Sequence, residues 1–416
     1  MPCGPGSKPP DFIGLGKTVS GTVGSMCMLP IVSNKIRSLL LAVAAHKTEV
    51  LSLTRRLVRY RSYTPGGAES TVDFIDSWFE SRGVKTLRYG GAGPHGELSS
   101  LVVRVGSGDA KILLHGHADV VPGEEEQFEA REENGELYGR GVYDMKGALA
   151  AMMYAVEDLH ETGCDATVEL LIVPDEEREY GGSKGAEVLI KNGHTGDFLI
   201  TGEPTDFHIG VQAKGVLALR VVLQGRSAHG SRPWLGKNAV LLGYEHYKRV
   251  LELPFTKERS DLFPYPSINM ARIIGGDVIN RVPDRATYDL DIRYLPEQDP
   301  QEIARQIRAI DLPAEVEVLF SHEPTYVSRD NPFVKTLREV AARHFRGNPV
   351  GVGRHGASDI VFFQRAGVPG VEFGPVGGGH HGPNEFVVAS SLETYRRMLV
   401  QFVQILAANG GASGGS

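Results

Sequence analysis

The stretch Ile112-Leu-Leu-His-Gly-His-Ala-Asp119 joins a short apolar run to two histidines and an aspartate. The apolar run predicts a buried strand that ends where the polar residues begin. Residues two positions apart on a strand end point the same way, so His117 can face a metal ion while Asp119 orients its ring. Taken alone, such a motif is more often a solvent-facing loop, and His115 is interpreted as a packed neighbour and not as a ligand.

Carboxylates occupy two comparable positions further along the chain. Asp144 follows two glycines, which permit a tight turn, and precedes a predicted helix. Its carboxylate can bridge two metals or simply cap that helix. Glu176 and Glu177 follow a predicted strand that ends at Val173. Such a pair can be divided between a metal and a water, although a solvated acidic turn is the alternative.

Two more segments complete the set. Glu203 follows the predicted strand 198–201, at a strand end where α/β proteins bind ligands, or it is a turn residue before a proline. A glycine-rich loop presents His380 and His381, which compete on residue type. Together the five segments supply two histidines and three carboxylates as ligands, with a further carboxylate as base. This set predicts a centre of two divalent metals that activates a water.

The composition is that of an ordinary globular protein. The chain has 416 residues, 41% hydrophobic and 23% charged, which is long enough for two domains. Its net charge of −7 argues against a nucleic-acid partner, and the lack of an 18-residue apolar stretch predicts no membrane span. Three cysteines (Cys3, Cys27 and Cys164) lack zinc-site spacing and are too few for a disulfide framework. We therefore expect a reducing, cytoplasmic setting.

Hydrophobic periodicity predicts alternating helices and strands around an inserted unit. Helices are predicted at 35–61 (as one long or two short helices), 69–82, 146–161, 182–192, 237–251, 301–310, 333–345, 358–366 and 390–408. Strands are predicted at 101–105, 112–114, 168–173, 198–201, 216–223, 267–274, 286–295, 316–320 and 370–373. The outer elements favour an α/β domain with a mixed, mostly parallel sheet, and the order β-α-β-β-α-β after residue 211 is typical of an α+β ferredoxin-like unit.

These elements predict five parts of the chain. They are a flexible extension at 1–34, a first part of the catalytic domain at 35–210, an inserted lid or dimerisation domain at 211–322, a second catalytic part at 323–408 and a flexible tail at 409–416. All five polar segments fall in the catalytic parts and none in the inserted domain. That shared location is what favours the metal interpretation over the separate alternatives.

The motifs as a set resemble those of the M20 metallopeptidases, a family that includes succinyl-diaminopimelate desuccinylases, acetylornithine deacetylases, aminoacylases and glutamate carboxypeptidases. The matching motifs are His-Ala-Asp-Val-Val-Pro, Gly-Arg-Gly-Val-Tyr-Asp-Met-Lys-Gly, Asp-Glu-Glu, Gly-Glu-Pro-Thr, Gly-Arg-Ser-Ala-His-Gly and His-Gly-Pro-Asn-Glu. The resemblance implies two divalent metal ions per chain, zinc or cobalt, and a small-molecule substrate.

The resemblance also implies roles for single residues. Asp144 would bridge the two ions, with His117 and Glu203 completing one site and Glu177 and His381 the other. The spacing His-x-x-Asn-Glu selects the second histidine of the doublet. Glu176 would be the general base, Asp119 would support the first histidine, and the Asp144–Met145 peptide bond is expected to be cis.

Substrate-binding residues follow from the same resemblance. His229 matches a histidine that in dimeric members reaches the partner subunit's site to stabilise an oxyanion, although a surface-loop role is the alternative. Asn280 and Arg293 would hold the substrate, the arginine through an α-carboxylate. Arg354 and Ser358 lie in a stretch similar to the family's carboxylate-binding loop, where an arginine is not standard and could tune the choice of acyl group.

The function implied is hydrolysis of the linear amide of an N-acyl amino acid, of the desuccinylase or deacetylase type, by a homodimer. Glu203, where other branches carry aspartate, favours these branches, while the bulky residues after the Glu176-Glu177 pair depart from many members. A dipeptidase or glutamate carboxypeptidase with the same metals is one alternative. A catalytically silent binding protein on the same fold is another.

Overall fold

The computed structural model describes residues 49–93, 95–177, 183–345 and 349–410. The expected extension at 1–34, the first part of the helix predicted from residue 35, the bulky residues after Glu177 and most of the expected tail lie outside the described residues. The part of that first helix that is described runs over 49–58.

A mixed sheet forms the larger layer, as expected. Its strand order is β1-β2-β6-β3-β7-β15-β8-β13, with β14 beside β8. The bounds are β1 (Thr86–Ala92), β2 (Leu98–Val105), β3 (Lys111–His117), β6 (Thr167–Val173), β7 (Phe198–Thr201), β8 (Ile209–Ala213), β13 (Thr325–Tyr326), β14 (Gly351–Arg354) and β15 (Gly370–Glu372). The central strands β6, β3, β7 and β15 are parallel to one another, and antiparallel pairs flank them.

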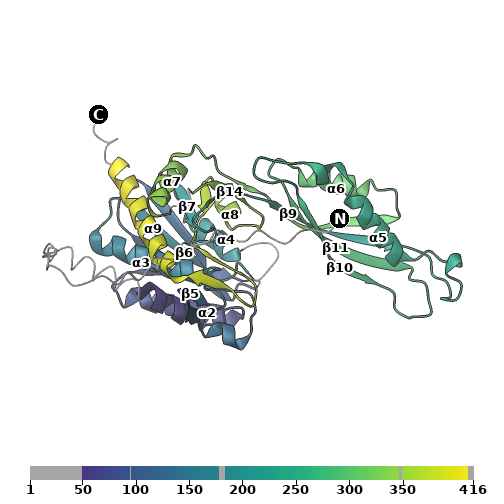
Figure 1. Ribbon diagram of the computed structural model, residues 1–416, viewed down its shortest axis with the longest axis horizontal. Helices are drawn as coiled ribbons and strands as arrows, with labels where there is room; N and C mark the ends of the chain where they lie inside the picture. The colour runs from purple at the N-terminus through teal and green to yellow at the C-terminus, as the bar shows by residue number, and fades with distance from the viewer. Residues whose placement is uncertain (1–48, 94, 178–182, 346–348, 411–416) are drawn as a thin grey trace, which may run out of the picture. The chain divides into compact units, whose positions relative to one another are not determined.

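Helices cover both faces of this sheet. The bounds are α2 (Pro65–Glu80), α3 (Lys146–Thr162), α4 (Lys184–Lys191), α7 (Pro332–His344), α8 (Ile360–Arg365) and α9 (Ala389–Gly410). Alternate residues of β3 face opposite sides of the sheet. Ile112 and Leu114 pack in the core that includes α2, α3, α7 and α9, whereas Leu113 packs in the core that includes α4 and α8. Figure 1 shows the yellow helix α9 alongside α3.

Helix starts follow from capping chemistry. The side chain of Thr64 accepts the N–H of Gly67, and Pro65 occupies the first turn of α2, where its missing N–H costs nothing. The helix therefore begins at 65 and not at the predicted residue 69. Polar side chains cap α4, α5, α6 and α7 in the same way.

The segment after β8 forms the expected ferredoxin-like unit. Its elements are β9 (Gly215–Gln224), α5 (Ala239–Val250), β10 (Ser267–Gly275), β11 (Arg285–Tyr294), α6 (Pro300–Arg308) and β12 (Ala314–His322). The antiparallel sheet has the order β10-β11-β9-β12. Alternate residues of β9 and β11 enter one core with α5 and α6, which explains the period of two in the sequence.

A third sheet was not predicted. It has the order β16-β17-β5-β4, with β4 (Arg131–Glu133), β5 (Glu136–Tyr138), β16 (Gly377–Gly378) and β17 (Phe386–Val388). Short 3₁₀ turns occupy Glu125–Phe128, Pro233–Leu235 and Pro254–Lys257. Within the ranges that the structure describes, every helix is too short or too polar to cross a lipid bilayer.

Candidate metal centre

Three neighbouring parallel strands end at the candidate centre. Strand β3 ends at His117, β6 is followed by Glu176 and Glu177, and β7 is followed by Glu203. The carboxyl ends of parallel strands meet at one edge of a sheet. These four side chains therefore come together although their strands are separated in the sequence.

Two further side chains reach the same place from outside these strands. Asp144 lies in the turn before α3, and the Asp144–Met145 peptide bond is cis, as the resemblance predicts. His381 lies between β16 and β17, while the ring of His380 packs against Tyr143 with a centroid separation of 6.0 Å. The structure therefore brings His381, and not His380, to Asp144.

Asp144 stands between two histidine–glutamate pairs. Its Oδ1 lies 3.2 Å from Nε2 of His117, and that nitrogen is 3.8 Å from Oε1 of Glu203. Its Oδ2 lies 3.3 Å from Nε2 of His381, and that nitrogen is 2.9 Å from Oε1 of Glu177. Each oxygen of the Asp144 carboxylate thus faces a different pair, which is the arrangement required of a carboxylate that bridges two ions.

The donor set fits a divalent metal. Ligand atoms of His117, Asp144 and Glu177 all lie within 4.8 Å of one another, so groups from both histidine–glutamate pairs are close enough to belong to one compact metal centre. Imidazole nitrogen and carboxylate oxygen are ordinary zinc ligands. The side chains of these residues are only 0%, 10% and 9% exposed, and a bound cation would stabilise carboxylates buried this close together.

Burial and like charge dominate the electrostatics of the cluster. Burial and the charge of Asp144 raise the pKa of Glu203 well above its ordinary value. Burial, with the charges of Glu203 and Glu177, likewise raises the pKa of Glu176. Burial alone would raise the pKa of Asp144, but hydrogen bonds from the two histidines hold it below its ordinary value. The same hydrogen bonding, to Asp144 and Glu177, raises the pKa of His381 to about 10. An added cation would relieve this crowding of carboxylates.

Asp119 joins His117 to the acidic loop. Its backbone carbonyl lies 3.0 Å from Nδ1 of His117, whereas its carboxylate Oδ1 is 3.6 Å from that nitrogen. The carboxylate accepts the N–H groups of Glu176 and Glu177 at 3.1 and 2.9 Å. The nearest acceptor for the histidine is therefore the carbonyl, and the carboxylate holds the loop that carries both glutamates. His115 instead hydrogen-bonds a threonine of β7 at 3.0 Å.

A buried carboxylate to which the sequence assigned no role holds this geometry. Oε1 of Glu385 accepts the N–H groups of Tyr143 and Asp144 at 3.1 and 3.2 Å. Its Oε2 lies 2.7 Å from Nη1 of Arg140, and the two side chains are 1% and 4% exposed. Arg140 also donates to the carbonyl of His381 at 3.3 Å. This ion pair ties the turn of Asp144 to the segment that supplies the second histidine.

A second buried carboxylate joins two of the predicted substrate-binding residues, Arg354 and Ser358. Oε2 of Glu372, the last residue of β15, lies 2.6 Å from Nε of Arg354, and the glutamate side chain is 4% exposed. Burial raises the pKa of Glu372, while Arg354 and the hydroxyl of Ser358 oppose that rise. The sequence signal that could have identified Glu372 was its position near the end of a predicted strand, like that of Glu203.

The other predicted substrate-binding residues lie on the ferredoxin-like unit. Nδ1 of the exposed His229 is 2.8 Å from a serine hydroxyl two residues later. The N–H of Gly230 donates to the carbonyl of Asn280 at 2.6 Å, and a Cβ on that glycine would lie 3.0 Å from the Asn280 backbone. Nε and Nη2 of Arg293 lie 2.9 and 3.2 Å from the Asp291 carboxylate. Among the described residues, none of these three predicted side chains forms a hydrogen bond with the metal cluster.

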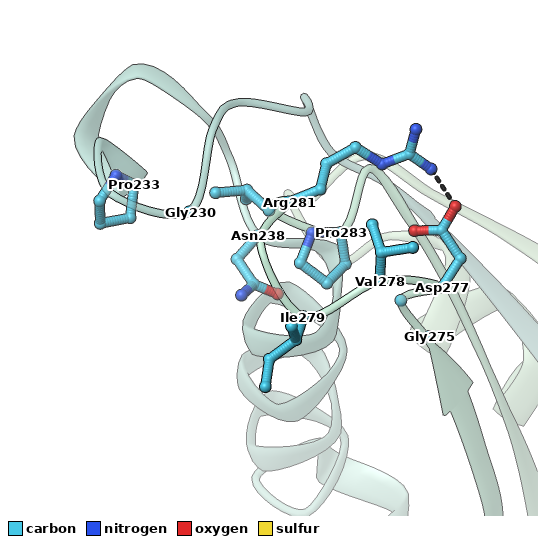
Figure 2. Close-up of a pocket in the computed structure, with 11 residues that line it drawn as sticks. Gly230, Pro233, Asn238, Gly275, Asp277, Val278, Ile279, Arg281 and Pro283 are labelled. Carbon is cyan, nitrogen blue, oxygen red and sulfur yellow. Dashed lines mark hydrogen bonds and ion pairs between the residues drawn. The ribbon is translucent and has the colours of Figure 1, made fainter.

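A pocket of about 490 Å³ lies beside His229 and Asn280. Its walls are residues 275–279 and 281–283, together with Gly230, Pro233 and Asn238, and Figure 2 shows the guanidinium of Arg281 directed at Asp277. The residues that line it include none of the metal cluster, so this pocket and the candidate centre are separate features.

The family model for peptidase family M20/M25/M40 matches residues 113–405, which include every member of the metal cluster. This chain belongs to that family. It is accordingly a metal-dependent hydrolase with the M20 fold, so the family, the fold class and the enzyme class expected from its sequence are confirmed.

A desuccinylase and a deacetylase align over most of this M20 chain. The succinyl-diaminopimelate desuccinylase of Gluconacetobacter diazotrophicus is 31% identical over 392 residues, 88% of this chain and 99% of the relative. The acetylornithine deacetylase of Proteus mirabilis is 28% identical over 358 residues, 81% of this chain and 89% of the relative.

Solved M20 structures have the same fold. A tripeptidase from Staphylococcus aureus superposes with a TM-score of 0.72 at 21% identity, over 87% of this chain and 99% of that one. A Bacillus subtilis protein described as a dinuclear metal-binding peptidase of the M20 family gives a TM-score of 0.64 at 15% identity, over 88% and 99%.

Proposed function

We propose that this M20 hydrolase cleaves the amide bond of an N-acyl amino acid, in a reaction of the desuccinylase or deacetylase type, with two zinc or cobalt ions. The observation that carries the metal part is the position of Asp144, whose two oxygens face two different histidine–glutamate pairs. The acyl part is supported by the names of relatives at 28% and 31% identity.

The proposed ligand sets divide at Asp144. His117 and Glu203 would hold one ion and Glu177 and His381 the other, with Asp144 shared between them. When bound, the ions supply Lewis acidity for the substrate carbonyl and lower the pKa of a water. The protein's own contribution is orientation, because Asp119 and Glu385 fix the backbone of the segments that carry these ligands.

Glu176 is proposed as the residue that moves the proton. Its carboxylate takes no part in the four contacts around Asp144, although its backbone N–H is held by Asp119 at 3.1 Å. In this role the carboxylate accepts a proton from the attacking water and returns it to the leaving amine, acting first as base and then as acid.

We further propose that 211–322 forms an inserted lid and dimerisation domain between catalytic parts at 35–210 and 323–408, within a cytoplasmic homodimer. Exposed apolar side chains on α5 and β10 support a second copy as partner, since Leu241, Tyr244 and Ile274 are 66%, 60% and 58% exposed. Strand β10 is also the edge of its sheet, where free backbone groups can pair with another strand. In the dimer His229 would reach the partner's centre and stabilise the oxyanion, and Asn280 and Arg293 would contact the substrate.

A turnover panel tests the proposed reaction. Zinc- or cobalt-loaded enzyme should hydrolyse N-succinyl-diaminopimelate or N-acetylornithine with a kcat/KM of about 10⁴ M⁻¹s⁻¹ or more, and a chelator should abolish this activity. Dipeptides and N-acyl glutamates belong in the same panel. Faster turnover of a dipeptide than of every acylated amino acid would replace the proposal with a peptidase function.

Complementation between two inactive variants tests both the proposed role of His229 and the formation of a dimer. His229→Ala and Glu176→Ala should each be nearly inactive alone, because each removes one group from every site. Coexpressed heterodimers then contain one site with both groups intact, so the mixture should recover about a quarter of wild-type activity. Size-exclusion chromatography supplies the control. Heterodimers that form without recovering activity would rule out action of His229 on the partner's centre.

A further inference from the structure

The hydroxyl of Tyr143 contacts a carboxylate from a distant part of the chain. Tyr143 directly precedes the candidate bridging ligand Asp144, and it is buried, with only 4% of the residue exposed. Its hydroxyl donates to Oδ1 of Asp206 at 2.8 Å. The same oxygen accepts the N–H of Gly377 at 3.0 Å. One carboxylate oxygen of Asp206 therefore joins segments that lie 63 and 171 positions away along the chain.

Each of the three joined segments carries a candidate metal ligand. Asp144 directly follows the tyrosine, Glu203 lies three residues before the aspartate, and His381 lies four residues after the glycine. A displacement of one segment relative to the others would therefore move a ligand. The hydrogen bonds at the aspartate thus connect the candidate bridging carboxylate to one member of each histidine–glutamate pair.

Close packing holds the tyrosine in this place. A Cβ on Gly377 would lie 2.6 Å from Cδ2 of Tyr143, so the absence of a side chain at this glycine leaves room for the ring. The ring also packs against that of His380, with a centroid separation of 6.0 Å. The backbone N–H of Tyr143 donates to the carboxylate of Glu385 at 3.1 Å. The tyrosine is therefore fixed at its backbone, its ring and its hydroxyl.

The backbone around Asp206 is held in an uncommon conformation. Asp206 and Phe207 have φ angles of 55° and 63°, in the left-handed region that residues other than glycine rarely adopt. Their N–H groups donate to the carbonyls of Pro375 and Gly374 at 3.2 and 3.0 Å. Such a conformation persists only where the surrounding structure holds it. The position of this carboxylate is therefore set by a constrained backbone.

We propose that Tyr143 and Asp206 are positioning residues, whose hydrogen bond sets how the Asp144 carboxylate is aimed between the two histidine–glutamate pairs. The pair acts through the backbone of Asp144 and through the segments that carry Glu203 and His381, and not by contact with the substrate. This role rests on the proposed two-metal hydrolysis and extends it to residues outside the ligand set. A hydrogen bond from a hydroxyl to a carboxylate is stronger than one between neutral groups, which suits it to fixing a turn.

Removal of the hydroxyl alone tests this role. Tyr143→Phe keeps the ring against Gly377 and deletes only the donor. A lost hydrogen bond to a charged group corresponds to about 10- to 100-fold, so the variant loaded with two cobalt ions should have a kcat lower by about that factor. The KM for the acylated amino acid should stay nearly unchanged, because a misaimed ligand affects the transition state more than substrate binding. The visible absorption spectrum of the bound cobalt should change, since it reports the geometry of the ligands.

Changes at Asp206 test whether the two residues act as a pair. Asp206→Asn keeps an oxygen that can accept the hydroxyl, so it should retain more activity than Asp206→Ala. The double variant with Tyr143→Phe and Asp206→Ala should be no less active than Asp206→Ala alone, because the same hydrogen bond is lost only once. Effects of the two substitutions that multiply would show that the residues act independently, which would overturn the inference.

Tyr138→Phe is the matched control. Its hydroxyl also donates to a carboxylate, that of Glu136 at 2.5 Å, but both residues lie on β5 and join no ligand-bearing segments. This variant should keep the kcat and the cobalt spectrum of wild type. If Tyr143→Phe lowers only the melting temperature and keeps both as well, its hydrogen bond has only a structural role and the inference is wrong.

Metal binding measures the same role without any substrate. If wild type hydrolyses no acylated amino acid, the proposed function fails, but the positioning role can still be tested. Competition with a chelator gives the apparent affinity of the protein for cobalt. Tyr143→Phe should weaken this affinity by about 10-fold, as expected for a contact outside the ligand set, and Tyr138→Phe should not. An unchanged affinity together with an unchanged cobalt spectrum would contradict the inference.

Discussion

Replacing Glu176 by glutamine should lower kcat by about 10²- to 10⁴-fold while the protein still binds two metal ions per chain. Glutamine keeps the size of the side chain but cannot accept the proton of the attacking water. It also leaves the hydrogen bond from the backbone N–H to Asp119 in place. Steady-state kinetics and elemental analysis of the same preparation measure the two parts of this expectation.

The adjacent residue provides the comparison. Glu177 lies 2.9 Å from Nε2 of His381, so Glu177→Gln should weaken binding of one ion as well as turnover. The two neighbouring substitutions should therefore differ in metal content, although both lower activity. Near-wild-type kcat in Glu176→Gln, with both metals present, would remove the assigned role of proton carrier.

Replacing Asp144 by alanine should have the largest effect on metal binding. Its two oxygens lie 3.2 Å and 3.3 Å from the two histidines, so both metal positions lose a ligand at once. Loss of an outer contact alone typically costs 10- to 100-fold in affinity, so we expect at least about a 100-fold weaker apparent affinity for both ions and no detectable turnover. Dialysis against buffered zinc followed by elemental analysis measures the remaining ions.

Single-site variants distinguish a bridge from an ordinary ligand. His381→Ala should lose one ion and keep the other, because only one oxygen of Asp144 faces that histidine. Circular dichroism confirms that each variant is folded. Retention of two tightly bound ions by Asp144→Ala would show that the carboxylate does not bridge them.

Periodicity in the sequence predicted most of the fold. The alternation in β9 and β11 follows from a sheet with one face against α5 and α6, and this let the ferredoxin-like unit be found without homologues. The sheet β16-β17-β5-β4 could not be found in this way. Its strands have two or three residues, which is too short for any period to appear. The start of α2 was misplaced because the cap at Thr64, and not the first apolar residue, sets where that helix begins.

The meeting of four residues at the centre was predictable because each of them lies at or just after the end of a predicted strand. His117, Glu176, Glu177 and Glu203 each follow an apolar run, and parallel strands bring such ends together. The choice of His381 over His380 required the resemblance. Asp119 and Glu385 accept hydrogen bonds from backbone N–H groups of the centre, and Glu372 forms an ion pair with Arg354. The sequence does not show which N–H group or which arginine a carboxylate will contact.

The ion pair of Glu385 with Arg140 affects how much of the chain must be synthesised before the metal centre can form. Glu385 binds the N–H of Asp144 from 241 residues further along the chain, and His381 arrives on the same segment. Every helix and strand through β16 is synthesised before either residue. A chain that ends before this segment therefore lacks His381, one of the five proposed metal ligands, and the carboxylate that holds the N–H of Asp144, so we expect it not to form a complete metal centre.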